Sequence, residues 1–190
     1  MLRAALTVVG VLVVLLTVVV AGAMATGYLV VGDPGAAASQ VLSGDFESPN
    51  VTVEETRVGP VGVPEGGIEE IDEDGATMSN RLRVENPNHL GGVVQVVEYD
   101  VYMSGDRDGE YDYVGNGTVR DLRVPPNGTV TETNELEIGY EDLVAATGGA
   151  GLEGLVGGAT WYARIEGEAE IALGPASFTV EFEKVNEVGR

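Results

Sequence analysis

The stretch Trp161–Leu173, which reads WYARIEGEAEIAL, decides the fold. Apolar and polar side chains alternate along it, so that one face is apolar and the other carries Arg164 and several glutamates. Successive side chains of a β-strand point to opposite faces, and alternation sustained over this length is typical of a half-buried strand. The predicted inward residues are Trp161, Ala163, Ile165, Ala169, Ile171 and Leu173.

Similar alternating stretches recur along the chain, separated by turn residues. They cover residues 51–58, 77–85, 93–103, 111–124, 129–138 and 178–182. One short helix is expected over 140–147, where Glu141 and Asp142 lie in the first turn and suit the helix dipole. Short strands with one apolar face and turns between them predict an all-β domain with one short helix, built as an antiparallel β-sandwich.

The N-terminal part has the pattern of a membrane span. Residues 4–25 (AALTVVGVLVVLLTVVVAGAMA) carry no charge, and about 20 such residues in a helix span a hydrocarbon core. Arg3 precedes this segment and acids follow it, which by the positive-inside rule predicts a cytoplasmic N-terminus. A cleaved signal peptide is the alternative, because Ala23-Met24-Ala25 fits a cleavage site, although its apolar region would be unusually long.

These features divide the chain into three predicted parts. Residues 1–26 form a transmembrane anchor, residues 27–49 a flexible linker rich in Gly, Ala, Ser and Pro, and residues 50–186 the β-domain. The expected location is the cell membrane, which the chain would cross once, with the C-terminal domain outside the cell.

The charge of the chain limits its partners. The sequence has 31 acidic and 10 basic residues, and Lys184 is its only lysine. Such a chain lacks the basic surface that nucleic-acid binding requires, so no nucleic-acid partner is expected. An acid-rich, lysine-poor surface is typical of proteins that work in very high salt, where charges are screened over about 3 Å at 1 M. The composition therefore predicts an extreme halophile, an archaeon in particular.

Residue types also limit the chemistry. The chain has no cysteine, which excludes disulfides and thiolate metal sites, and His89 is its only histidine. Neither a nucleophile elbow nor a phosphate-binding loop is found, so we expect no catalytic residue, no cofactor and no enzymatic activity.

Two acidic stretches are weak candidates for a calcium ion. Glu70–Gly75 resembles the first half of an EF-hand loop, but Arg81 stands where the bidentate glutamate belongs. The second stretch has acids at alternate positions, namely Asp106, Asp108, Glu110 and Asp112. Solvated acidic residues are the favoured interpretation of both stretches.

Three N-x-T sequons are candidate glycosylation sites in an exported domain. Their acceptor residues are Asn50, Asn116 and Asn127. The alternative for the last two is that Asn-Gly is a common turn dipeptide.

Arg83–Asn88 (RVENPN) is the most informative motif. An alternating strand runs into Asn86-Pro87-Asn88, and the next strand ends in Tyr99–Tyr102 (YDVY). This order resembles the type 2 late embryogenesis abundant (LEA) proteins, and more narrowly their water stress and hypersensitive response (WHy) domain. The resemblance extends over about 51–185, through a Gly-x-Val strand at 128–130, a helix and a closing aromatic strand at 178–182.

The resemblance implies a seven-stranded, fibronectin-III-like sandwich with one helix and no enzymatic activity. It also implies a role in desiccation, osmotic or cold stress, and the holding of partly unfolded clients. The residues themselves suggest a structural motif. Pro87 lacks an N–H and ends the strand ladder, while Asn86 and Asn88 can bond the neighbouring backbone.

The expected function is therefore stress protection by a non-enzymatic protein, held at the membrane by its N-terminal helix and shielding unfolding client proteins. One alternative is a structural or adhesion and assembly module that binds other proteins of the cell envelope. A second alternative is a surface domain that binds divalent cations weakly.

Overall fold

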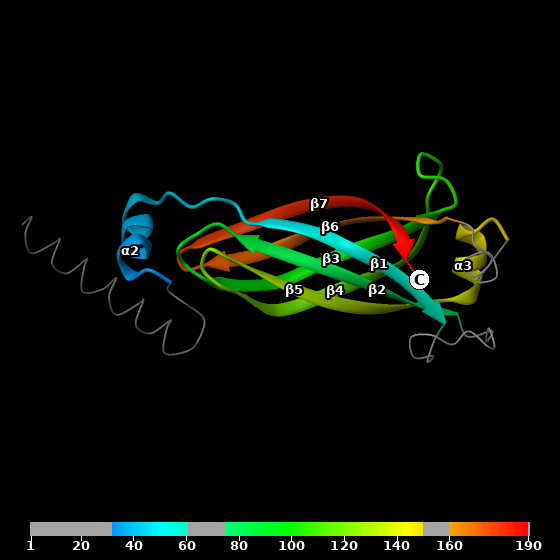
Figure 1. Ribbon diagram of the computed structural model, residues 1–190, viewed down its shortest axis with the longest axis horizontal. Coiled ribbons are helices and arrows are strands. Elements are labelled where there is room, and N and C mark those ends of the chain that lie inside the picture. Colours follow the sequence, from blue (N-terminus) through cyan, green and yellow to red (C-terminus); the bar gives the residue numbers. More distant parts are fainter. Residues whose placement is uncertain (1–31, 61–74, 150–159, 190) are drawn as a thin grey trace, which may run out of the picture.

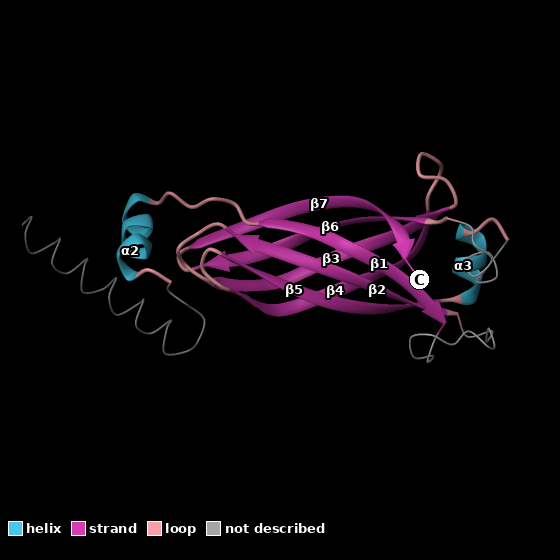
Figure 2. Cartoon of the chain, in the orientation of Figure 1, coloured by secondary structure: helices cyan, strands magenta, loops and turns pink. Residues whose placement is uncertain are grey.

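The computed structural model describes residues 32–60, 75–149 and 160–189. These residues form seven strands and two short helices (Figures 1 and 2). In chain order they are α2 (Pro34–Ser43), β1 (Asn50–Pro60), β2 (Ala76–Asn86), β3 (Gly92–Ser104), β4 (Asp112–Val124), β5 (Gly128–Ile138), α3 (Tyr140–Ala146), β6 (Tyr162–Leu173) and β7 (Ala176–Gly189). Helix α2 lies at one end of the elongated molecule, and α3 lies at the other (Figure 1).

All seven strands belong to one sheet, in the order β4-β3-β6-β7-β1-β2-β5. Neighbours are antiparallel except β1 and β7, which run parallel and, within the described part of the chain, pair at Thr56–Val188 and Arg57–Gly189. The two edge strands, β4 and β5, lie side by side, so the sheet curls into a near-barrel.

This arrangement confirms the prediction of a mostly β domain with largely antiparallel strands. The immunoglobulin or fibronectin-III-like sandwich is not what the structure shows, because the short β1–β7 pairing joins the two halves into one sheet. A second helix, α2, is also present where only α3 was expected.

One hydrophobic core fills the near-barrel. Strands β1 to β6 contribute fully buried side chains, and β7 contributes half-buried ones such as Phe178 and Phe182. The predicted inward face of β6 is buried along its whole length, from Trp161, just before the strand, to Leu173. The alternation of apolar side chains in this stretch therefore places it correctly, because one face of the strand packs on the core.

Two asparagine side chains bridge the seams of the near-barrel, where backbone pairing is short or absent. Between β5 and β4, Asn134 Nδ2 donates to the Thr118 carbonyl over 3.0 Å. Between β7 and β1, Asn186 Nδ2 donates to the Val53 carbonyl over 3.4 Å and to Thr56 Oγ1 over 3.3 Å. Side-chain amides thus replace part of the backbone ladder that a closed barrel would have.

Helix α2 lies within the segment 27–49 that was expected to be a flexible linker. Asp33 caps its N-terminus and accepts hydrogen bonds from Gly35 N at 2.8 Å and Ala36 N at 3.2 Å, which lower the pKa of the Asp33 carboxyl. Pro34 occupies the first turn, and Gly44 ends the helix with a φ of 75°. Residues typical of helix ends are present in the sequence, but the helix between them consists largely of small residues and has no clear apolar face, so no helix was predicted there.

The predicted membrane span at 4–25 lies outside the described residues, as does most of the Glu70–Gly75 stretch. Neither of the two helices that the structure describes is long and apolar enough to cross a membrane.

Candidate functional site: the Asn86-Pro87-Asn88 turn

The Asn86 side chain organises the turn that follows β2. It is 2% exposed, and its Nδ2 donates to the carbonyls of Leu90 at 2.7 Å and Pro125 at 3.0 Å. Its Oδ1 accepts from the backbone N and the side-chain Nδ2 of Asn88, each at 3.0 Å. Asn86 thus ties the β2–β3 connection to the residues before β5, and Pro87, which is exposed, ends the β2 ladder.

Asn88 connects the same turn to the segment before β1. Its side chain is fully buried, and its Oδ1 accepts from Gln40 Nε2 at 2.7 Å and from Glu47 N at 2.9 Å. Its Nδ2 donates to the Glu47 carbonyl at 2.8 Å. A buried amide with this many partners is strongly held, because leaving any of them unpaired would cost the desolvation of a polar group.

Gln40 of α2 binds the turn at two points. Besides its bond to Asn88, its Oε1 accepts from the backbone N of His89 at 3.0 Å. Beside these polar contacts, Leu90 packs with Ala37, Val41 and Phe46 in a small apolar cluster separate from the main core. Helix α2 is therefore fastened to the β-domain by both hydrogen bonds and apolar packing; we call this contact the α2 latch.

His89 lies at the surface of the latch. Its Nδ1 is 3.0 Å from Asn127 Nδ2, and the Asn127 backbone N donates to the Asn88 carbonyl over 2.8 Å. An amide Nδ2 can only donate, so His89 Nδ1 accepts in this geometry. The β4–β5 turn is thereby joined to the same end of the molecule as α2.

The side chains of this site hold separate segments of the fold together. Its buried polar groups are amides that donate and accept within the fold, and its titratable side chain, His89, bonds an amide of the neighbouring turn. The sequence pattern predicts the motif Asn86-Pro87-Asn88, but nothing in it indicates Gln40, whose partner Asn88 lies 48 positions away.

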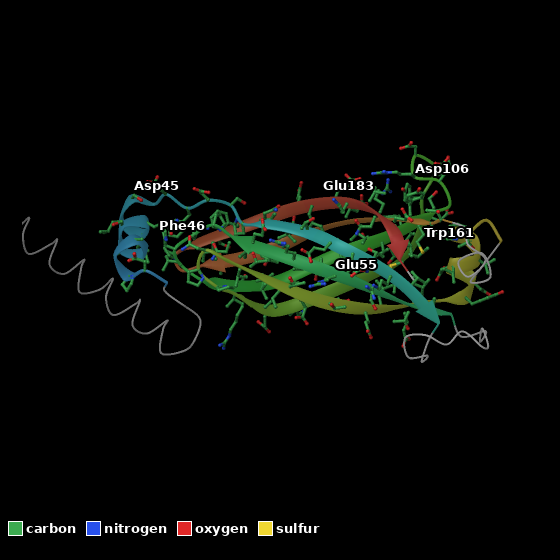
Figure 3. All side chains as sticks on the ribbon, viewed as in Figure 1. Asp45, Phe46, Glu55, Asp106, Trp161 and Glu183 are labelled. Carbon is green, nitrogen blue, oxygen red and sulfur yellow. The ribbon has the colours of Figure 1, made fainter. Side chains whose placement is uncertain are left out.

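The acidic candidates at 106–112 lie at the opposite end of the molecule, in and beside the β3–β4 loop. Figure 3 places Asp106 in the β3–β4 loop near α3, far from Phe46 beside α2. Asp106 Oδ1 accepts from the backbone N of Asp108 at 3.1 Å, as a turn residue does. Among the described residues, no three histidine, aspartate or glutamate side chains gather closely enough to hold a metal ion, so the acids at 106, 108, 110 and 112 do not converge. Arg81, which stands where an EF-hand loop would have its bidentate glutamate, forms an ion pair with Glu54, with 3.4 Å between Arg81 Nε and Glu54 Oε2.

Two rows of carboxylates cross the outer face of β3, β6 and β7. In one row Glu98, Glu168 and Glu181 lie opposite one another, and in the other Asp100, Glu166 and Glu183 do. A shallow hollow separates the rows. Like charges directly opposite in a sheet repel each other, so these acidic rows, as we call them, act against the pairing that holds them.

Two arginines of the described residues lie close to carboxylates of the acidic rows. Arg120 lies 3.3 Å from Glu98, and Arg164 lies 3.9 Å from Glu166. The Arg164 guanidinium also lies over the rings of Tyr102 and Tyr111, 4.9 and 5.1 Å from their centroids. The Glu166 carboxylate beside the Tyr102 hydroxyl raises the pKa of that phenol.

The three sequon asparagines are all exposed, in different backbone settings. Asn50 begins β1 opposite Glu85, and Asn116 lies within β4 opposite Asp100. Asn127 lies in the turn between β4 and β5, with a positive φ of 45°.

Comparison with known proteins finds solved structures only. No family model matches the chain, and no curated protein matches it. A solution structure of an Arabidopsis thaliana protein matches with 14% identity and a TM-score of 0.49, covering 76% of this chain and 83% of that one. A crystal structure of an Archaeoglobus fulgidus protein matches with 16% identity and a TM-score of 0.43, covering 73% and 98%.

A third structural match is a candidate late embryogenesis abundant (LEA) protein, solved in solution. It is 11% identical, covers 96% of this chain and 88% of that one, and has a TM-score of 0.43. The structural neighbours of the chain thus include a LEA-like protein.

Proposed function

We propose that the chain is a non-enzymatic stress-protection protein of the type 2 LEA and WHy kind, anchored in the cell membrane with its β-domain outside the cell. The observation that carries this proposal is the Asn86-Pro87-Asn88 turn. The motif that resembles the WHy domain is, in the fold, the centre of the α2 latch.

The latch supports a specific arrangement at the membrane. Helix α2 follows the predicted span at 4–25 and is fastened to one end of the near-barrel through Gln40 and Asn88. The β-domain would then stand on this end, with α3 and the β3–β4 loop farthest from the bilayer (Figure 1). Such a domain would hold its flanks, including the acidic rows, at a fixed distance from the lipid.

The acidic rows support work in concentrated salt or scarce water. Carboxylates are strongly hydrated, and their repulsion weakens as salt is added. A surface of this kind would stay soluble and wet while client proteins lose water. Shielding of partly unfolded clients by this hydrated surface is the proposed activity, and an extremely halophilic archaeon is the proposed source.

A protection assay tests the proposal. The full chain, reconstituted in lipid vesicles in molar salt, is dried together with an unrelated enzyme, and the recovered enzyme activity is recorded. An equally acidic, unrelated folded protein anchored in the same vesicles is the control. Recovery above this control supports the proposal, and recovery equal to the control contradicts it.

The envelope module remains the second candidate function, since the fixed, upright domain described above would also serve as a spacer. Crosslinking on intact cells distinguishes the two. One saturable envelope partner favours the module, and protection of many clients without a fixed partner favours the stress role.

A further inference from the structure

The β4–β5 turn lies where the chain would leave the membrane. Gly32, the first described residue, packs against this turn: a Cβ built on Gly32 would lie 3.2 Å from Pro126 Cβ. Asn127, which follows Pro126, forms a backbone hydrogen bond to Asn88 and a side-chain hydrogen bond to His89. Asn127 is therefore held, exposed, at the anchored end of the domain.

The geometry of the turn accounts for the residue types at two of the three positions of the Asn127 sequon. Asn tolerates the positive φ at position 127. Gly128 has no room for a side chain, because a Cβ there would lie 2.6 Å from Pro125 Cγ. Thr129, the residue that makes the sequence an acceptor, is exposed at the start of β5, and the turn geometry does not require it.

The other two sequons are built into backbone ladders. Residues 116–118 pair along β3, and the Thr118 carbonyl also accepts from Asn134. Residues 50–52 pair along β2, and Val51 between them is buried. An enzyme that must draw a sequon into its own cleft would have to break ladder pairs at all three residues of either sequon. At the third sequon only Gly128 and Thr129 are paired, with Asn86 and Glu85, and Asn127 is held by one backbone and one side-chain hydrogen bond.

We propose that Asn127 is an N-glycosylation site, modified on the folded domain by a membrane-bound transferase that uses a lipid-phosphate-linked glycan. Asn127 Nδ2 forms a bond to C1 of the donor sugar, the bond from C1 to the phosphate oxygen breaks, and the lipid phosphate leaves with the proton that the amide loses. A primary amide has two N–H bonds, so the product keeps one to donate to His89. This proposal rests on the proposed export of the domain.

One experiment can test both which asparagine is glycosylated and on which side of the membrane the domain lies. Trypsin separates the three sequons, because it cuts after Arg57, Arg107, Arg120, Arg123 and Arg164 and so leaves Asn50, Asn116 and Asn127 on different peptides. The full chain is isolated from the organism that encodes it, and glycopeptides are identified by tandem mass spectrometry. Beforehand, intact cells are treated with a membrane-impermeant amine reagent. Lys184, the only lysine, is exposed on β7 and reports whether the domain is outside.

The expected result is a labelled Lys184 with glycan on the Asn127 peptide at the highest occupancy of the three. Thr129→Ala should abolish that glycopeptide, and Thr129→Ser should restore it while leaving the turn unchanged. A labelled Lys184 with an unmodified Asn127, or with equal or higher occupancy at Asn116, would overturn the site and leave the location standing. An unlabelled Lys184 without glycan would overturn both.

Discussion

The Tyr99 hydroxyl donates to Asn134 Oδ1 over 3.0 Å and so joins β3 to β5 across the interior of the near-barrel. The same amide donates to the Thr118 carbonyl of β4. One side chain thus links three strands, two of which are the edges of the sheet. Tyr99 is 2% exposed and Asn134 is half-buried, so this bond lies at the edge of the core.

Replacing Asn134 by leucine should destabilise the domain. The variant leaves the Tyr99 hydroxyl and the exposed Thr118 carbonyl without this partner, and leaving the buried hydroxyl unpaired costs about 1–3 kcal/mol. Urea unfolding in molar salt measures the effect. Thr133→Ala, an exposed neighbour on β5, is the matched control and should change the midpoint little. An unchanged midpoint for Asn134→Leu would mean that packing alone closes the β4–β5 seam.

Gly117→Ala should also destabilise the domain, through Tyr99. A Cβ at position 117 would lie 2.2 Å from Tyr99 Cζ, so the ring would have to move off its bond to Asn134. Overpacking of this kind costs about 1–3 kcal/mol. Gly59→Ala, where a Cβ meets nothing within 4 Å, is the control. In a Tyr99→Ala background the penalty of Gly117→Ala should disappear, and a penalty that persists would locate the strain elsewhere.

The strands could be predicted from the sequence because each has one face on the core. The alternation from Trp161 to Leu173 corresponds residue by residue to burial in β6. Closure of the sheet could not be predicted. It depends on two residue pairs between β1 and β7 and on the side chains of Asn134 and Asn186. These two asparagines are polar residues whose hydrogen-bond partners the sequence pattern does not indicate.

The candidate site was predicted in part. Asn-Pro-Asn after a strand indicated a turn whose side chains bond the backbone. The latch needs Gln40, whose bond to Asn88 spans 48 positions in the sequence, and α2 itself has only one fully buried residue, Ala37. Its apolar face is thus too small to produce a helical pattern, although Asp33, Pro34 and Gly44 are ordinary helix boundary residues.

Gln40→Ala should release α2 while the near-barrel stays folded. The variant removes the side-chain bonds to Asn88, His89 and the Asp45 carbonyl but none within the sheet. Hydrogen exchange measured by mass spectrometry should become faster for the α2 segment and stay unchanged in β3 and β6. Gln95→Ala, an exposed glutamine on β3, is the control. Faster exchange throughout the domain would show that the latch supports the whole fold.

Alkaline pH should weaken the fold through Tyr99. Burial raises the pKa of this phenol, so the folded state holds its proton more tightly than the unfolded state does. Its contribution to stability is complete below the unfolded pKa of about 10 and is lost as the pH rises through the higher folded value. The free energy of unfolding, measured in urea from neutral to alkaline pH, should fall less steeply in Tyr99→Phe than in the exposed control Tyr140→Phe. Equal slopes would assign the alkaline loss to other groups.

The acidic rows should make stability depend on salt. Glu168 is exposed and lies between Glu98 on β3 and Glu181 on β7, so it faces a like charge on both sides. Added salt screens this repulsion, and the melting temperature should rise with sodium chloride concentration.

Neutralising Glu168 tests the same point at one residue. Glu168→Gln should raise stability in low salt by roughly a few tenths of a kcal/mol, the usual size for exposed charges, and the gain should vanish in molar salt. Glu137→Gln on β5, which lies opposite the uncharged Thr77, is the control and should gain less. An equal gain for both variants would trace the salt dependence to the net charge of the chain, because repulsion between opposed carboxylates would then have no effect of its own.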